Sequence, residues 1–164
     1  MYQRILVPID GSPTSDQGLA EAIKLAQLTG ASLRLIYVMD SLIYASGFGV
    51  YGDYSGDLIV RMEEAGKQVL EDGSTRANAA NLKVDSLLID GLGIRVSEAV
   101  IQQAKDWSAD LIVIGTHGRR GINRLLLGSD AEQIMRLAPV PVLLVRASEP
   151  VAKVDALSDA QSSK

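Results

Sequence analysis

Glycines and a serine are spaced along one stretch of the chain, residues 111–131, in an arrangement that suits the binding of phosphate. An uninterrupted apolar run ends at Gly115, and Gly118 follows it three residues later. Nine residues then separate Gly118 from the pair Gly128 and Ser129. Glycine lets backbone N–H groups approach an anion without a Cβ atom in the way, and the first turn of a helix offers unpaired N–H donors. The stretch therefore predicts a strand, a phosphate-binding loop and a helix.

Side chains in the same stretch suit phosphate as well. Ser129 is placed either to cap the helix or to donate its hydroxyl to a phosphate oxygen. Guanidinium groups pair with phosphate, and we expect at least one of three arginines to do so: Arg119, Arg120 and Arg124. His117 is the only histidine of the chain, so it forms no histidine metal cluster. We interpret it as a loop residue beside the phosphate rather than a catalytic base.

Three carboxylates lie where they would meet such a ligand. Asp10 follows the first apolar run and has two readings: it contacts the nucleoside or a phosphate-bound metal, or it caps the local backbone in a turn. We favour the functional reading because of its place at a strand end. Asp40 ends the second apolar run, where an acidic side chain often accepts a hydrogen bond from a ribose hydroxyl. For Asp40, this ribose contact and the absence of any functional role are equally favoured. Asp130 would repel phosphate unless a divalent cation lies between them, or else it stabilises the helix N-terminus.

The elements that must position these residues alternate along the chain. We predict strands at residues 5–9, 32–39, 84–89, 111–114 and 140–145, and helices at residues 13–28, 58–80, 96–107 and 129–138. Ser12 is the expected cap of the first helix, and residues 90–93 are expected to turn the chain after the third strand. Gly66 and Gly73 weaken the second helix, and Gly73 predicts a bend in it. This alternation predicts an α/β domain with a parallel sheet and right-handed crossovers. Ligands bind such sheets outside the carboxyl ends of the strands, where the strand order switches. Asp10, residues 38–40 and Gly115 follow or end three of the strands, so we expect them to converge on one crevice.

We call Gly115, Gly118, Gly128 and Ser129 the glycine frame. It resembles the ATP-binding signature of the universal stress protein family, GxxG(x9)G(S/T), and matches it in full. The resemblance extends to the opening ILVPIDGS and the closing PVPVLLV, and covers the chain to about Arg146. It implies a Rossmann-like, adenine nucleotide alpha hydrolase-like domain over residues 1–146. The sheet would be five-stranded and parallel in the order 3-2-1-4-5, with helices on both faces. The implied ligand is ATP, together with Mg or Mn.

The resemblance also implies which residues line the nucleotide site. In the family, the backbone at the position of Val38 reads the edge of adenine. The implied set is Pro8, Asp10, Val38, Met39, Ile114, Gly115, His117, Gly118, Arg119, Gly128, Ser129 and Asp130. Asp10 is the one candidate metal ligand. The family often has an apolar residue where this chain has Asp130, a departure that would weaken the binding of nucleotide without metal.

Bulk properties exclude several classes of protein. The 164 residues carry a net charge of −4, which argues against a general nucleic-acid binder. The absence of cysteine excludes disulfides and thiolate chemistry. The sequence has neither the apolar core of a signal peptide nor an apolar run near the roughly 20 residues of a membrane span. We therefore expect no membrane insertion and a cytoplasmic location. Residues 147–164 are small and polar, which predicts a disordered tail.

Two further segments bear on partners and ligand access. The apolar edge at Val142–Val145 favours pairing with another chain, and the resemblance implies a homodimer through the fifth strands. Whether dimers pair further into tetramers is left open. Residues 41–57 alternate glycines with aromatic residues, which predicts a mobile loop. That loop either orders as a lid over the nucleotide or has no role.

Three functions compete. The favoured one is a regulatory ATP-binding protein that dimerises and passes its nucleotide occupancy to an unknown partner protein. The second is a slow ATPase or phosphotransferase, and the absence of a GxxxxGK element and of kinase motifs argues against it. The third is a nucleotide-free dimeric interaction module, and the complete glycine frame argues against that.

Overall fold

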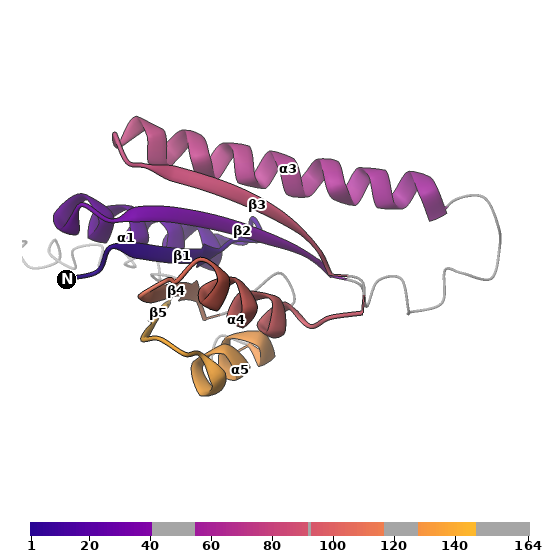
Figure 1. Cartoon of the computed structure of the whole chain (residues 1–164). Helices are drawn as coiled ribbons and strands as arrows, with labels where there is room; N and C mark the ends of the chain where they lie inside the picture. The colour runs from indigo at the N-terminus through magenta and orange to yellow at the C-terminus, as the bar shows by residue number, and fades with distance from the viewer. Residues whose placement is uncertain (41–54, 92, 117–127, 147–164) are drawn as a thin grey trace, which may run out of the picture.

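The computed structural model describes residues 1–40, 55–91, 93–116 and 128–146. Within these ranges, five strands form one parallel sheet in the order β3-β2-β1-β4-β5 (Figure 1), as predicted. The strands are β1 (Arg4–Pro8), β2 (Ser32–Asp40), β3 (Val84–Gly91), β4 (Leu111–Gly115) and β5 (Val142–Val145).

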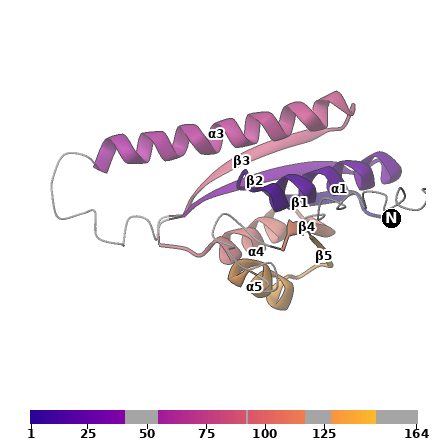
Figure 2. The same cartoon turned by 180° about the vertical axis from the view of Figure 1, so that it is seen from behind.

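Helices cover both faces of the sheet, which confirms the predicted architecture (Figure 1 and, from behind, Figure 2). The helices are α1 (Pro13–Thr29), α3 (Ser55–Ala79), α4 (Val96–Asp106) and α5 (Ser129–Leu137). One core holds Leu19 of α1 and Leu70 of α3. The core on the other face holds Val100 of α4 and Ile134 of α5.

Strand β4 is apolar throughout, and β1 is apolar from Ile5 onward, because both faces of these central strands are covered. Ile5 and Val7 of β1 lie in the core beneath α1 and α3, whereas Leu6 lies in the core beneath α4 and α5. All three side chains are fully buried. A parallel strand covered on both sides reads as a continuous apolar run rather than an alternating one, and that pattern predicted β1 and β4.

Helix α1 begins at the predicted residue and ends at Thr29, one residue later than predicted. Ser12 is its N-cap and accepts a hydrogen bond from the Ser15 N–H at 3.3 Å, and Pro13 is the first helical residue. Gly30 ends the helix with a φ of 73°, in the left-handed region that glycine adopts without strain.

Helix α3 departs from the prediction in two ways. It begins at Ser55, three residues earlier than expected, so residues 55–57 belong to the helix and not to the glycine-rich loop. The rest of that loop, residues 41–54, lies outside the described residues. The expected bend at Gly73 is wrong, because α3 is one unbroken helix (Figure 1). A Cβ atom on Gly73 would lie 3.0 Å from Leu35 Cδ1, so the glycine lets the helix pack closely on the sheet.

Strand pairing moves two other boundaries. Strand β3 continues to Gly91, through residues predicted to form a turn, because β2 pairs with it as far as Asp40. Strand β5 begins only at Val142, after Pro141, which has no N–H to give a sheet ladder. The carbonyl of Pro141 still accepts the Ile112 N–H at 3.0 Å.

In the described part of the chain, no helix is long and apolar enough to cross a membrane.

Candidate functional site

The carboxyl ends of β2, β1 and β4 lie next to one another at one edge of the sheet. The chain passes from β1 to β2 on one side, and β4 flanks β1 on the other, so the strand order switches at β1. Asp10 follows β1, Val38 lies near the end of β2, and Gly115 ends β4. These three residues therefore come to the same switch point, where open α/β sheets bind their ligands.

Strand β2 extends past the end of β1 and leaves backbone groups facing the switch point. The pairing of the two strands ends with Pro8 opposite Ile36, and the Ile9 N–H donates to the Ile36 carbonyl at 2.9 Å. Alternate residues of a strand turn their N–H and C=O to the same neighbour. Val38 therefore faces the same side as Ile36. Among the described residues, no strand pairing or backbone bond joins Val38 to the β1 side, so its N–H and C=O are available there.

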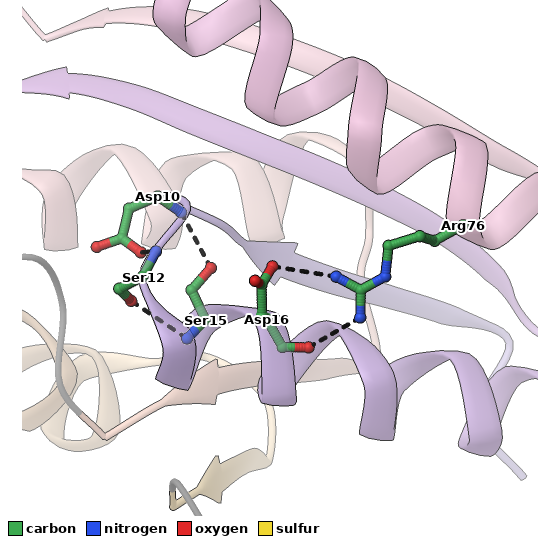
Figure 3. A network of polar contacts seen from close by, with 5 residues as sticks. All are labelled: Asp10, Ser12, Ser15, Asp16 and Arg76. Carbon is green, nitrogen blue, oxygen red and sulfur yellow. Dashed lines mark hydrogen bonds and ion pairs between the residues drawn. The ribbon is translucent and has the colours of Figure 1, made fainter.

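Asp10 is held in a turn at the end of β1 (Figure 3). Its Oδ1 accepts the Ser12 N–H at 2.9 Å, and its own N–H donates to Ser15 Oγ at 3.0 Å. Gly11 between them has a φ of 76°. The capping role expected for Asp10 is thus present. A carboxylate has about four lone-pair sites, so the capping role does not by itself exclude a ligand contact; that contact stays a prediction.

Beneath Asp10, the first turn of α1 holds a cluster of buried hydroxyl groups. Ser12, Thr14 and Ser15 are each less than a tenth exposed, and the Ser12 and Thr14 hydroxyl oxygens are 3.2 Å apart. The sequence identified only Ser12, as a cap. For the rest of the cluster the sequence carries one signal, Ser15, which lies in the first turn three residues after the cap.

Gly115 has a packing role that the sequence did not reveal. A Cβ atom there would lie 2.7 Å from the carbonyl carbon and oxygen of Thr14 and 2.9 Å from the Ser15 nitrogen. Real Cβ atoms do not approach backbone this closely, so only glycine allows α1 to begin against the end of β4. The predicted approach of phosphate to Gly115 is a separate role, which stays a prediction.

Thr116 joins the two ends of the glycine frame. Its N–H donates to the Val145 carbonyl of β5, and its carbonyl accepts the Gly128 N–H, both at 2.9 Å. The segment between Thr116 and Gly128 therefore begins and ends at one point beside β4. Five predicted phosphate-site residues lie in that segment, outside the described residues: His117, Gly118, Arg119, Arg120 and Arg124.

The start of α5 corrects one prediction. Gly128 is the N-cap, and Ser129 is the first helical residue, so Ser129 does not cap the helix. Its alternative role, donating a hydroxyl to phosphate, stays a prediction. Asp130 lies exposed in the first turn, where a carboxylate interacts favourably with the helix dipole.

The other predicted residues contribute mainly backbone to this edge. Met39 and Ile114 are buried, one in each core, so their side chains are committed to packing. Pro8 and Val38 are half-buried. In the described ranges, no group of three or more histidine, cysteine or acidic side chains gathers as a metal cluster.

At the opposite, amino edge of the sheet, Arg34 contacts both Asp85 and Trp107, and we call these three side chains the Arg34 strap. The Arg34 guanidinium donates two hydrogen bonds to the Asp85 carboxylate, at 2.7 and 2.9 Å, and lies 4.8 Å from the centre of the Trp107 ring. The hydrogen bond to Asp85 raises the pKa of Arg34, against the lowering effect of burial. A cavity of about 380 Å³ opens beside this strap, lined by Arg4 and Lys83 among others. The strap joins β2, β3 and α4 far from Asp10.

An open parallel sheet with helices on both faces and a switch point at β1 defines a Rossmann-like α/β domain. The universal stress protein family matches residues 1–146, and this chain belongs to that family. The resemblance carried by the glycine frame is thereby confirmed.

Relatives and solved structures agree with this assignment. A universal stress protein of Thermus aquaticus is 36% identical over 151 residues, which cover 89% of this chain and 100% of the relative. The structure of protein MJ0577 of Methanocaldococcus jannaschii matches with a TM-score of 0.77 at 26% identity, covering 92% and 99% of the two chains. A crystal structure of a universal stress protein in complex with cAMP matches with a TM-score of 0.63 at 24% identity, covering 90% and 98%. The last likeness shows the shared fold.

Proposed function

We propose that this chain binds ATP at the carboxyl edge of its sheet and acts as a homodimeric regulatory protein, whose nucleotide occupancy is read by a partner protein. The observation that carries the proposal is the available N–H and C=O of Val38 at the switch point. Asp10 and the joined ends of the glycine frame lie on the neighbouring strand ends.

The backbone of Val38 suits adenine in particular. A donor and an acceptor on the same side of one residue complement the ring N1 acceptor and the exocyclic amino donor of adenine. Guanine presents a donor and a carbonyl acceptor at the corresponding positions, so it would oppose like groups. A site that leaves polar groups unpaired against the wrong ligand discriminates strongly. The family member in complex with cAMP also holds an adenine nucleotide.

The starts of two helices, and the hydrogen bond between Thr116 and Gly128, support a phosphate site at these strand ends. Gly128 begins α5 and is bonded to Thr116 at the end of β4. The first turn of α1 packs against Gly115 on the same strand end. Helix N-termini favour anions through their unpaired N–H groups and dipoles.

Asp10 fits a role beside a phosphate-bound Mg²⁺ or Mn²⁺. Protein sites for Mg²⁺ commonly supply one or two carboxylates, and substrate phosphates and water complete the coordination. One carboxylate at this edge is therefore enough. The metal would offset the repulsion between the phosphates and the carboxylates of Asp10 and Asp130.

The β5 edge fits the homodimer. Among the described residues, strand β5 pairs on one side only, with β4, and Leu143 within it is 38% exposed. Leu137 at the end of α5, 63% exposed, adds apolar surface. An apolar edge strand of this kind is a template for pairing with a second copy.

Two substitutions at Val38 test the adenine site. Val38→Pro removes the N–H that faces the switch point, and the ladder between β2 and β3 uses other residues, so a proline is tolerated as on an edge. Val38→Ala is the matched control, because it trims the side chain and keeps the N–H. Calorimetric titration should show ATP binding by the wild type and by Val38→Ala, weaker binding of GTP by both, and a loss of at least about tenfold for Val38→Pro. A wild type that binds no ATP, or binds GTP equally well, contradicts the proposal.

A further inference from the structure

Ser15 links the first turn of α1 back to the end of β1. Its hydroxyl oxygen accepts the Asp10 N–H at 3.0 Å, and its own N–H donates to Ser12 Oγ at 3.3 Å (Figure 3). The side chain is buried, with 6% of the residue exposed. The hydroxyl and the N–H of Ser15 are therefore both hydrogen-bonded within this turn.

Asp10 is the first residue beyond the sheet, and its orientation depends on these bonds. The residue before it, Ile9, still donates its N–H to β2. Asp10 instead gives its N–H to Ser15 and receives the Ser12 N–H on its carboxylate. Holding both the backbone and the side chain of one residue restricts the direction of its carboxylate. Without the Ser15 hydroxyl, the part-buried Asp10 N–H loses this hydrogen bond, and the turn holds Asp10 less firmly.

Ser15 is itself fixed against a second strand end. Its backbone nitrogen lies where a Cβ atom on Gly115 would be only 2.9 Å away, so α1 and β4 are in close contact here. The serine thus stands between the ends of β1 and β4, at the switch point. Its position is set by packing and does not depend on a ligand.

We propose that Ser15 is a positioning residue for the nucleotide site: it acts through Asp10, whose N–H it holds, and directs the Asp10 carboxylate toward the metal-bound phosphates. Ser15 itself makes no ligand contact. This inference rests on the proposed function, because it gives a role to a residue behind the proposed ATP site.

A double-mutant cycle tests the inference with Mg-ATP as the ligand. Asp10→Asn keeps an oxygen for the Ser12 N–H and removes the charge, and Ser15→Ala removes the hydroxyl. In the wild-type background, Ser15→Ala should weaken Mg-ATP binding about fivefold, the effect of one ordinary hydrogen bond. In the Asp10→Asn background it should have no further effect. An equal loss in both backgrounds would mean a merely structural role and overturn the inference.

Ser12→Ala is the matched control. It removes another buried hydroxyl from the same turn and the cap of α1, and it leaves the Ser12 N–H on Asp10 and the Ser15 hydroxyl in place. It should lower the melting temperature and weaken Mg-ATP binding less than Ser15→Ala does. If it weakens binding as much as Ser15→Ala, the effect belongs to the helix start in general and the inference fails.

Amide hydrogen exchange at Asp10, measured by NMR without nucleotide, separates this inference from the proposed function. Ser15→Ala should speed exchange at Asp10, and unchanged exchange overturns the inference whatever the protein binds. If the wild type does not bind Mg-ATP, both proposals fall. If it binds but Asp10→Asn leaves its affinity unchanged, the proposed function stands and the role of Ser15 alone is wrong.

Discussion

Gly18 of α1 and Gly115 of β4 lie directly against each other. A Cβ atom on Gly18 would be 3.2 Å from the Gly115 backbone nitrogen, and one on Gly115 would be 2.7 Å from the Thr14 carbonyl. Two glycines on different elements thus let a helix approach a strand more closely than side chains would allow. This approach brings the first turn of α1, with Ser15, to the strand end that begins the glycine frame.

Gly115→Ala should destabilise the fold by about 1–3 kcal/mol, the usual cost of overpacking, because its Cβ would meet backbone rather than a flexible side chain. Gly18→Ala should cost less, since its contact is looser and alanine gains about 1 kcal/mol of helix propensity over glycine. Urea unfolding of the two variants makes the comparison. Equal stabilities for wild type and Gly115→Ala would contradict the close approach of α1 to β4.

Gly66→Ala should destabilise the protein even though glycine is a poor helix former. Propensity alone predicts a gain of about 1 kcal/mol. The added Cβ, however, would lie 2.7 Å from Leu88 Cδ1 and 2.8 Å from the Tyr37 ring, which should reverse the sign. Thermal unfolding in a Leu88→Ala background gives the control, because the clash with Leu88 is then relieved. The penalty for Gly66→Ala should be smaller there, and a penalty of the same size would argue against this contact.

Gly128→Val should weaken ATP binding by at least about tenfold and leave the fold intact. Gly128 has φ −61° and ψ 144°, which any residue adopts, so the substitution brings no backbone strain. The loss would come from the side chain, which keeps phosphate from the backbone. Gly128→Ser is the matched control, because serine adds a smaller side chain than valine and caps a helix well. Calorimetric titration measures affinity, with circular dichroism as the check on folding; undiminished binding by Gly128→Val removes this glycine from the site.

Leu143→Lys should convert a dimer into a monomer, because it places a charge on the exposed edge strand β5. Leu28→Lys is a matched control, since Leu28 is 78% exposed on α1 and the chemical change is the same. Sedimentation velocity at micromolar concentration should show dimers for the wild type and Leu28→Lys, and monomers for Leu143→Lys. A monomeric wild type rules out the β5 interface.

The strands were predictable because burial on both faces leaves an unmistakable apolar run, as in β1 and β4. The ends of the strands and helices were less predictable, because they depend on neighbouring elements that are distant in the sequence. Asp90 and Gly91 have the composition of a turn, but pairing with the long strand β2 keeps them extended. Gly66 and Gly73 suggested a weak helix, but contacts with the sheet make small residues favourable there.

The same distinction holds at the candidate site. Asp10 and Gly115 stood out because each follows or ends an apolar run, and strand ends of a parallel sheet meet at one edge. Ser15 and Gly18 did not stand out, because their roles come from the contact between α1 and β4, which no local pattern records. Ser129 was expected as a possible cap from its residue type, yet the extended backbone before α5 places Gly128 there.

The hydrogen bond between Thr116 and Gly128 has a consequence for how the family can diversify. Because the segment between them leaves and returns at one point, its length is not dictated by any distance that it must span. Doubling the length of such a closed loop costs only about 0.6 kcal/mol of closure entropy. The sheet itself therefore does not fix the length at this junction, so relatives whose ligand does not require the nine-residue spacing between Gly118 and Gly128 can differ there without any change to the sheet.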